Sequence, residues 1–538
     1  MNKFLDKRIG KLSFTIFSGL LLTLSWPTYG FAPLLFIGFV PLLLVLDKIC
    51  EDNRKRKGLR HFGTVYLALL IWNVGTTWWV YYSSDWGAIA AFVFNTLFMT
   101  IIFHLSYFTR KRYGSLAGNI SLIFFWVAFE YLHLSWELSW PWLTLGFGFA
   151  SYTSWVQWYE YTGILGGSIW VLTINILIFN LIKQWINNKD FQWKKRVAVI
   201  LSLVIVPIGL SLLIYTNYNE KYSPVNIVVV QPNFDPYNEK FSISDAEKLD
   251  MMLKLAVEKV DSTTDYLVFP ETALPEAVWE EFLNESPNIK TIKEFIKPFP
   301  KLNFVCGMGS ARRFKKVDNL SETARQSDTD PNIYYDDYNA SFQVDNSGKI
   351  QIYHKSKLVP GVEKMPYPKI FGFLGKYAID LGGTSGSYGT QEDRTVFNSI
   401  NGKWKIGTAI CYESIYGDFL SGYLKNGADL LFIITNDGWW NDSPGYKQHC
   451  NYGRLTAIEF RRSIARSANT GISCFINQKG DMQQATKWWE PAVIKQSINA
   501  NSEMTFYAKH GDYLGKIASI LSIGTLLFLF LGLFIKKK

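Results

Sequence analysis

The chain has 538 residues, of which 48% are hydrophobic, 16% aromatic and 19% charged. The charged share lies below the ~25% usual in globular proteins. The deficit falls on residues 1–217 and 512–538, which excludes a wholly water-soluble protein. Much of the formal net charge of +10 comes from short basic clusters beside these apolar runs. We therefore expect the basic excess to face anionic lipid head groups, and we predict no nucleic-acid partner.

Eight apolar segments are candidates for membrane-spanning helices, which need about 20 apolar residues each. Basic residues precede the first segment, but no small-residue cleavage site follows it, so we expect an uncleaved helix rather than a signal peptide. The second segment contains Pro41 and follows a short turn, which favours a hairpin or a broken helix. The candidates are 12–28, 31–47, 62–80, 87–109, 116–133, 164–182, 197–215 and 517–535.

The distribution of Lys and Arg predicts an orientation, because cytoplasmic loops carry an excess of these residues. With the N-terminus in the cytoplasm and eight crossings, the inside segments hold 21 Lys and Arg and the short outside loops hold none. Both termini are then cytoplasmic. The predicted domains are a membrane domain with seven helices (1–217), an extracytoplasmic domain (218–511), and a last helix with a basic tail (512–538).

One of the outside loops, residues 134–163, is crowded with Trp and Tyr. An aromatic belt at the bilayer surface is the simpler interpretation of this composition. A lipid-facing entrance beneath the outer domain is the alternative.

The cysteines and histidines give no indication of a disulfide framework or of a metal site. Five cysteines are present, and four of them lie in the outer domain. An odd, sparse set of this kind does not read as a disulfide framework. His449 and Cys450 are adjacent and lack the spacing of a zinc site, so we predict neither a metal nor a cofactor.

The outer domain opens with "VNIVVVQPN" (225–233), whose β-branched apolar run predicts a buried strand. The next segment, "DAEKLDMMLKLAVEKV", has apolar residues three and four apart, as a helix does. Further strand-like runs follow, with helical stretches between several of them and a hairpin turn at "VDNSGKI". This alternation predicts an α/β layered fold. The strand-like runs lie in "DYLVFPET", "LNFVCGMG", "NASFQVDNSGKIQIYHKSKL", "WKIGTAICYES" and "ADLLFIITNDGWW".

Three chemically distinct side chains each follow one of these strands. Glu271 follows "YLVFP", Lys355 follows "IQIYH" and Cys411 follows "IGTAI". The ends of strands in α/β sheets are where ligand groups gather. Each residue alone has an ordinary structural interpretation. Cys411 would be a buried thiol, Glu271 would cap a helix and Lys355 would be a solvated charge at the end of a strand. Taken together, they supply a nucleophile, a carboxylate and a cation that can meet in one pocket.

These three residue types suit acyl transfer through a thioester. The thiolate is the nucleophilic form of cysteine. A carboxylate can take the thiol proton and later return it to a leaving group. An ammonium favours the thiolate and, together with the backbone N–H of Tyr412, can donate to the oxyanion formed when a carbonyl is attacked.

At these residues the chain resembles the nitrilase superfamily, with its Glu-Lys-Cys triad on an αββα sandwich. The flanking motifs "VFPETALP", "YHKSKLVPGVEKMP", "GTAICYES" and "TNDGWWNDSPGYKQHC" are similar to those of the apolipoprotein N-acyltransferase family. The layout of seven spans, an outer domain and one last span is similar too. The resemblance implies a multi-pass α-helical membrane domain of about eight spans plus an α/β nitrilase-like αββα sandwich domain.

The resemblance also implies a reaction. An acyl chain would pass from a phospholipid, typically phosphatidylethanolamine, to Cys411, and then to the α-amine of the N-terminal diacylglyceryl-cysteine of a lipoprotein. Glu271 would be the general base and acid, and Lys355 would stabilise the oxyanion. Glu363 would support the site as a second carboxylate, and Tyr412 and Glu413 would shape the pocket. The location implied is the cell inner membrane, with the catalytic domain in the periplasm.

The chain departs from the family pattern at two places. Phe241 stands where family members have a Trp, so an aromatic side chain is kept at this position, and the resemblance implies its contact with lipid or thioester. Gly361–Val362 precede Glu363, where Phe-Gly is common. The apolar, Gly-rich segment 364–389 is hypothesised to be a mobile lid, with an ordered surface loop as the alternative. The segment "FWVAFEYL" faintly matches a family pattern that implies a role for Glu130, with a structurally paired carboxylate as the alternative.

Two other functions are compatible with parts of the sequence. A membrane-tethered nitrilase-type amidase would use the same three residues with water as the acceptor. Eight spans favour lipid substrates instead, because one helix is enough to tether a hydrolase. A non-catalytic membrane scaffold is the third interpretation, and the presence of all three chemical groups argues against it.

Overall fold

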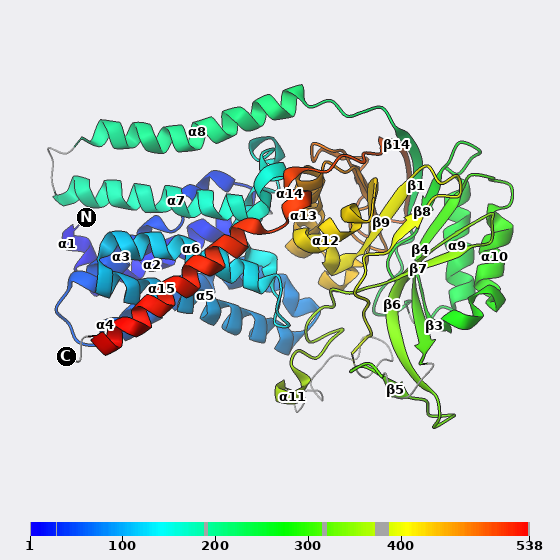
Figure 1. Ribbon diagram of the computed structural model, residues 1–538, viewed down its shortest axis with the longest axis horizontal. Coiled ribbons are helices and arrows are strands. Elements are labelled where there is room, and N and C mark those ends of the chain that lie inside the picture. The colour runs from blue at the N-terminus through cyan, green and yellow to red at the C-terminus, as the bar shows by residue number, and fades with distance from the viewer. Residues whose placement is uncertain are drawn as a thin grey trace. The chain divides into compact units, whose positions relative to one another are not determined.

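Long helices make up the first and last parts of the chain in the computed structural model (Figure 1). The structure describes residues 2–27, 29–187, 192–240, 242–314, 320–371 and 387–535. The chain divides into two units, Met1–Tyr218 with His510–Lys538, and Asn219–Lys509. The helices of the first unit are α1 (Asn2–Leu5), α2 (Arg8–Leu24), α3 (Val40–Glu51), α4 (Lys57–Thr77), α5 (Asp85–Tyr113), α6 (Ser115–His133), α7 (Tyr159–Asn187), α8 (Trp193–Asn217) and α15 (Tyr513–Ile535).

The first unit is a multi-pass membrane domain, as predicted. Among the described residues, six helical segments are long and apolar enough to cross a membrane: Ala32–Glu51, Asp85–Tyr113, Ser115–His133, Tyr159–Ile186, Trp193–Asn217 and Tyr513–Leu531. Helices α2 and α4 correspond to the other two predicted spans, 12–28 and 62–80. Helix α2 has only 17 residues, and α4 begins with two basic residues in its first four, Lys57 and Arg60. The count of eight spans therefore stays a prediction.

The second predicted span is a broken helix, as its proline and turn indicated. A 3₁₀ turn, Ala32–Phe36, precedes α3, and the helical path is interrupted between them. Asn175 of α7 satisfies the backbone groups left at the break: its side chain accepts from the Phe39 N–H at 2.8 Å and donates to the Leu35 carbonyl at 2.7 Å. Backbone polar groups inside a bilayer need such internal partners.

The aromatic loop 134–163 folds into the first unit. It contains the 3₁₀ turns Pro141–Leu143, Leu145–Phe149 and Thr153–Trp155. Trp142 is buried and packs edge-on against Trp79 at 5.0 Å, so this part of the loop is core rather than a surface belt. Glu130 accepts hydrogen bonds from the Trp126 indole and the Leu145 N–H, both at 2.8 Å. These contacts fit the interpretation of Glu130 as a structurally paired carboxylate.

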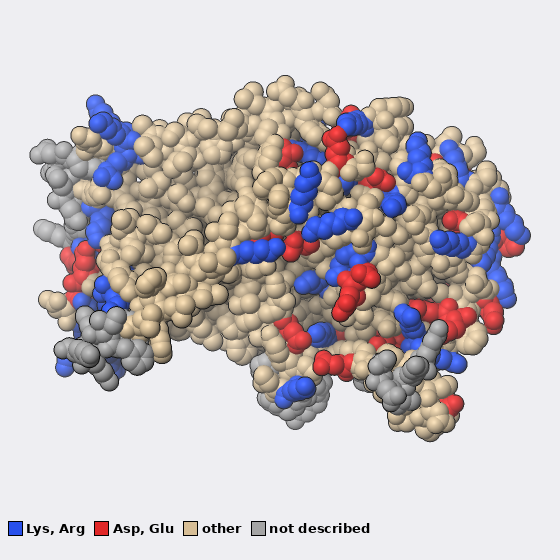
Figure 2. Space-filling model, in the orientation of Figure 1, with Lys and Arg blue, Asp and Glu red and all other residues tan. Residues whose placement is uncertain are grey.

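Basic side chains gather at one end of the first unit. On the face shown in Figure 2, the flank of its helices carries few charged residues, while Lys and Arg cluster at the end where Figure 1 marks both termini. Near the ends of α5 and α7, Arg110 and Lys183 contact Asp47 at 2.5 and 2.7 Å. These three residues tie the ends of α5, α7 and α3 together.

The second unit is built on two sheets. Within the described residues, one sheet has eight strands in the order β14-β1-β2-β4-β6-β5, with β3 pairing to β4 and β7 to β6. The other has six, in the order β13-β12-β11-β10-β9-β8. The strands are β1 (Pro224–Gln231), β2 (Tyr266–Val268), β3 (Leu274–Trp279), β4 (Asn303–Arg313), β5 (Arg325–Gln326), β6 (Tyr334–Asp345), β7 (Ile350–His354), β8 (Val396–Asn398), β9 (Lys405–Ile410), β10 (Leu430–Thr435), β11 (Ile464–Ala468), β12 (Cys474–Ile476), β13 (Met482–Gln483) and β14 (Ala492–Asn499).

The sheets form an αββα sandwich, and strand β1 shows why. Because side chains alternate along a strand, Val225, Ile227 and Val229 enter the core shared with the second sheet. Val228 and Val230, which point to the opposite face, pack into the core beneath the helices α9 and α10. Figure 1 shows those helices side by side next to the first sheet. The helices of this unit are α9 (Asp245–Val257), α10 (Pro287–Ile296), α11 (Pro368–Phe371), α12 (Gly417–Lys425), α13 (Pro444–Phe460) and α14 (Phe506–His510).

Tyr266 of β2 meets Phe432 of β10 edge-on at 5.2 Å within the core between the sheets. Helices α12 and α13 contribute Leu420 and Phe460 to the same core. The predicted α/β layered fold is confirmed. The hairpin predicted at "VDNSGKI" joins the antiparallel strands β6 and β7.

Candidate active site

The ends of three strands bring Glu271, Lys355 and Cys411 to one region of the second unit. Lys355 directly follows β7, Cys411 directly follows β9, and Glu271 lies three residues past β2. Strand β2 is parallel to β4, and β6 is antiparallel to both β4 and β7. Strands β2 and β7 therefore run in the same direction, and Glu271 and Lys355 leave the same edge of the first sheet.

A glycine in the neighbouring strand makes room for the backbone at Glu271. A Cβ at Gly307 of β4 would lie 2.5 Å from the Thr272 nitrogen and 2.7 Å from the Glu271 Cα. Thr272 has a φ of 43°, in the left-handed region that favours glycine. The chain therefore turns sharply immediately after Glu271, and only a residue without a side chain fits opposite that turn.

Lys355 joins two carboxylates in this site. Its Nζ lies 2.9 Å from Glu271 Oε1 and 2.7 Å from Glu363 Oε1. Asn339 of β6 donates from Nδ2 to the same two oxygens, at 2.8 and 3.1 Å. The Lys355 side chain is 1% exposed. A buried ammonium is stable only with such partners, so this arrangement fixes both carboxylates around one charge.

Glu271 and Lys355 each stabilise the charged form of the other. Burial works to raise the pKa of Glu271, but Lys355, with smaller contributions from Lys240 and Asn339, holds the pKa below its usual value. Burial likewise works to lower the pKa of Lys355, and Glu271, Glu363 and Cys411 together raise it well above its usual value. At neutral pH the site therefore holds a carboxylate and an ammonium.

Cys411 begins the 3₁₀ turn η9 (Cys411–Ile415) with a φ of 51°. A non-glycine residue in this left-handed region costs about 1–2 kcal/mol and marks a position that the surroundings enforce. Burial, followed by the charge of Glu271, raises the pKa of the Cys411 thiol, although Lys355 and a hydrogen bond with Thr435 work to lower it. The resting thiol is therefore protonated, and a base is needed to form the nucleophilic thiolate.

Glu413 joins the loop after β7 to the end of β9 through hydrogen bonds. Its Oε1 accepts hydrogen bonds from the Tyr353 hydroxyl at 2.6 Å and the Ser356 N–H at 2.7 Å. Its Oε2 accepts from the Ile410 N–H at 2.8 Å. The side chain is fully buried, and its donors are the Tyr353 hydroxyl and backbone N–H groups. Burial raises the pKa of Glu413 above its usual value.

The other residues predicted to support the site are Glu363, Tyr412 and Phe241. Glu363 lies beside Lys355 with its Oε2 accepting from the Val359 N–H at 2.9 Å, and Gly361 in that turn has a φ of 79°. Tyr412 is buried, and its ring packs edge-on against Tyr416 at 5.2 Å. Phe241 lies outside the described residues, as do residues 372–386 of the hypothesised lid 364–389.

Sequence reasoning missed two polar groups that touch Glu271. One is Asn339, and the other is the backbone N–H of Asn436, which donates to Glu271 Oε2 at 3.2 Å. Asn339 is a buried amide in the middle of β6. A short polar side chain in a strand flanked by apolar residues is a pattern that points to a buried partner.

Each of the five cysteines, all within the described residues, is a free thiol. Cys450 and Cys474 lie with their sulfurs 3.8 Å apart in the core.

Comparison with known proteins gives matches to both units. The family model for the apolipoprotein N-acyltransferase N-terminal domain matches residues 18–177, and the model for carbon-nitrogen hydrolases matches residues 225–505. The chain is 30% identical over 509 residues to the apolipoprotein N-acyltransferase of Chlorobaculum tepidum, covering 92% of each protein. It is 28% identical over 510 residues to that of Geobacter metallireducens, covering 92% of this chain and 91% of the relative.

Among solved structures, Nit3 of Saccharomyces cerevisiae, a member of the nitrilase superfamily, matches with a TM-score of 0.36 and 13% identity. That match covers 54% of this chain and 93% of Nit3.

Proposed function

The chain belongs to the apolipoprotein N-acyltransferase family, and we propose that Glu271, Lys355 and Cys411 carry out its acyl transfer from a phospholipid to a lipoprotein. The observation that carries this assignment is geometric: the Lys355 ammonium lies 2.9 Å from Glu271, and Glu413 joins the backbone next to Lys355 to the backbone next to Cys411. A base, a cation and a nucleophile therefore share one buried site at the ends of three strands.

In the first half of the reaction, Cys411 takes the acyl chain. Its sulfur attacks the ester carbonyl of the phospholipid while its proton passes to the Glu271 carboxylate. The Lys355 ammonium and the Tyr412 N–H donate to the oxyanion that forms. The carbon–oxygen bond to the glycerol then breaks, and Glu271 returns the proton to the leaving oxygen. The products are a lysophospholipid and an acyl thioester on Cys411.

In the second half, the acceptor takes the acyl chain from Cys411. The α-amine of the N-terminal diacylglyceryl-cysteine attacks the thioester carbonyl, and an amine proton passes to Glu271. The carbon–sulfur bond breaks, and the departing sulfur recovers that proton. The catalytic pair is held in place through both halves, because Glu363 contacts the Lys355 ammonium and the Asn339 amide donates to both carboxylates.

We propose phosphatidylethanolamine as the donor, and the inner membrane as the location. The cluster of Lys and Arg at one end of the first unit supports a cytoplasmic position for that end. The last segment of the chain, α15, is apolar and ends where both termini are marked in Figure 1. With this orientation, residues 218–511 are periplasmic and the basic ends of the chain are cytoplasmic.

The amidase alternative predicts a different acceptor. Because the match to the N-acyltransferase N-terminal domain covers residues 18–177, acyl transfer is favoured over hydrolysis. A transfer assay separates the two: purified protein is mixed with phosphatidylethanolamine and a peptide bearing an N-terminal diacylglyceryl-cysteine. We expect the peptide to gain one acyl mass as lysophospholipid accumulates. Free fatty acid with an unmodified peptide would contradict the proposal.

Replacing Lys355 by Met should shift the pH dependence of the acylation step. Lys355 holds the pKa of Glu271 below its usual value, so removing the cation leaves burial to raise it. Glu271 acts as a base only when ionised, and acylation is lost as pH falls through its pKa. The acid limb of the single-turnover rate, measured between about pH 4 and about pH 9, should therefore move to higher pH.

Lys254→Met is the matched control, because Lys254 is an exposed lysine paired with Asp250 on α9. Its profile should overlay that of the parent. An unmoved acid limb in Lys355→Met would mean that Lys355 does not set the charge of Glu271.

A further inference from the structure

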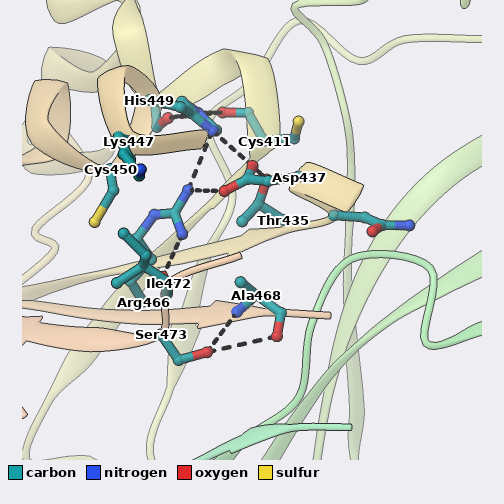
Figure 3. A network of polar contacts seen from close by, with 12 residues as sticks. Cys411, Thr435, Asp437, Lys447, His449, Cys450, Arg466, Ala468, Ile472 and Ser473 are labelled. Atoms are coloured by element: carbon teal, nitrogen blue, oxygen red, sulfur yellow. Dashed lines mark hydrogen bonds and ion pairs between the residues drawn. The ribbon is translucent and has the colours of Figure 1, made fainter. Parts of the chain in front are cut away.

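A buried cluster of Asp437, His449 and Arg466 lies behind Cys411 (Figure 3). His449 belongs to the "QHC" stretch that has no zinc spacing, and the proposed reaction gives it no part. It lies on α13, while Asp437 lies on the 3₁₀ turn Asp437–Trp440 and Arg466 on β11. Elements from three parts of the second unit therefore converge on one point.

The cluster contacts the backbone carbonyl of Cys411. His449 Nε2 lies 3.2 Å from the Cys411 carbonyl oxygen and 2.9 Å from Ser414 Oγ. The Ser414 hydroxyl donates to the same carbonyl at 2.7 Å. The carbonyl of Cys411 is thus held by two side chains, and it belongs to the residue whose φ of 51° is enforced.

The other imidazole nitrogen of His449, Nδ1, also lies close to polar groups. His449 Nδ1 lies 2.9 Å from Asp437 Oδ1, which also accepts from the Thr435 hydroxyl at 2.8 Å. Arg466 Nη2 donates to Asp437 Oδ2 at 2.7 Å, and its Nη1 donates to the Ile472 carbonyl at 2.5 Å. Burial works to raise the pKa of Asp437, but Arg466 and His449 lower it to about 2. The carboxylate is therefore ionised, and both Asp437 Oδ1 and Arg466 Nη2, the latter 3.1 Å away, contact Nδ1 of the imidazole.

The carbonyl that His449 contacts is one end of the Cys411–Tyr412 peptide. The other end of the same planar peptide is the Tyr412 N–H, the donor assigned to the oxyanion. A hydrogen bond to the carbonyl both fixes the plane of that peptide and polarises it, which strengthens donation from the N–H at the far end. A carbonyl oxygen only accepts, so Nε2 carries a proton when this hydrogen bond forms.

We propose that His449 is a positioning residue for acyl transfer, which orients the Cys411–Tyr412 peptide so that its N–H donates to the oxyanion. Asp437 and Arg466 hold the imidazole for this task. The inference rests on the proposed function, because the oxyanion arises only in acyl transfer at Cys411. It adds a role for a histidine that acts through the backbone carbonyl of Cys411.

Two reactions of Cys411 distinguish positioning from simple structural support. Acylation by phosphatidylethanolamine passes through an oxyanion, whereas alkylation by iodoacetamide displaces iodide and forms none. In His449→Leu, we expect single-turnover acylation to fall by about a hundredfold, because a misaligned Tyr412 N–H acts as a lost oxyanion donor. Alkylation of Cys411 in the same preparation should stay within about threefold of the parent.

Variants with smaller changes keep the test informative if His449→Leu does not fold. His449→Gln retains an N–H that can reach the carbonyl, so it should recover part of the lost acylation rate. Ser414→Ala removes the second donor to the same carbonyl and should slow acylation more than alkylation.

Arg462→Gln is the matched control. Arg462 is a buried arginine that donates to the carbonyls of Ala428, Phe460 and Glu503. This variant should lower Tm and leave acylation within about threefold of the parent.

Acylation within about threefold of the parent in folded His449→Leu would overturn the inference, as would acylation and alkylation falling in parallel. The failure of the proposed function would look different, because the parent protein itself would then form no acyl-enzyme. An active parent with an unaffected His449→Leu variant removes only the positioning role.

Discussion

Cys411→Ser should reduce acyl transfer to a diacylglyceryl-cysteine peptide by more than about a thousandfold. A serine hydroxyl ionises far less readily than a thiol, and Lys355 holds Glu271 as a weak base, with a pKa below its usual value. Glu271 can accept the thiol proton as the sulfur attacks, but it is a poor base for an alcohol. Initial rates of peptide acylation, followed by mass spectrometry with phosphatidylethanolamine in excess, measure the effect.

Cys50→Ser is the control for this variant. Cys50 is a free thiol of α3 in the first unit, so its replacement changes one sulfur without touching the proposed site. It should retain the parent rate. Transfer by Cys411→Ser within about tenfold of the parent would show that the acyl chain does not pass through residue 411.

Glu271→Gln should slow acylation of Cys411 by about a hundredfold to ten-thousandfold, the range expected for the loss of a general base. The amide has the shape of the carboxylate but cannot take a proton. Because burial raises the pKa of the Cys411 thiol, the thiol stays protonated without that base. Single-turnover release of lysophospholipid from phosphatidylethanolamine reports the step directly.

Glu294→Gln provides the comparison for the same chemical change at an exposed site. Glu294 lies on α10 and pairs with Lys297 at 2.5 Å. We expect its acylation rate to match that of the parent. If Glu271→Gln released lysophospholipid within about tenfold of the parent rate, another group would have to be the base.

The sequence located the candidate site because its residues follow recognisable strands. Runs such as "IGTAI" and "YLVFP" predict buried strands, and the residues after them lie at sheet ends in the structure. The two-layer arrangement follows from the period-two alternation of side chains along a strand. Strand β1 shows this division, because Ile227 lies in the core between the sheets and its neighbour Val228 lies in the core beneath the helices.

The supporting contacts could not be predicted, because they depend on tertiary geometry. Asn339 lies 68 residues from Glu271 in sequence, and nothing local indicates that its amide reaches that carboxylate. The raised pKa of Cys411 follows from its burial, which the sequence does not specify at that level of detail. Helix α2 (Arg8–Leu24) has as many residues as the predicted segment 12–28, but it begins and ends four residues earlier.

Intact-protein and peptide mass spectrometry of the protein incubated with phosphatidylethanolamine observes the proposed intermediate itself. We predict one acyl mass on the peptide that contains Cys411, removed by hydroxylamine and absent from Cys411→Ala. A folded protein that releases lysophospholipid and acylates the peptide, yet carries no acyl mass on Cys411 even when the acceptor is withheld, would contradict transfer through a thioester.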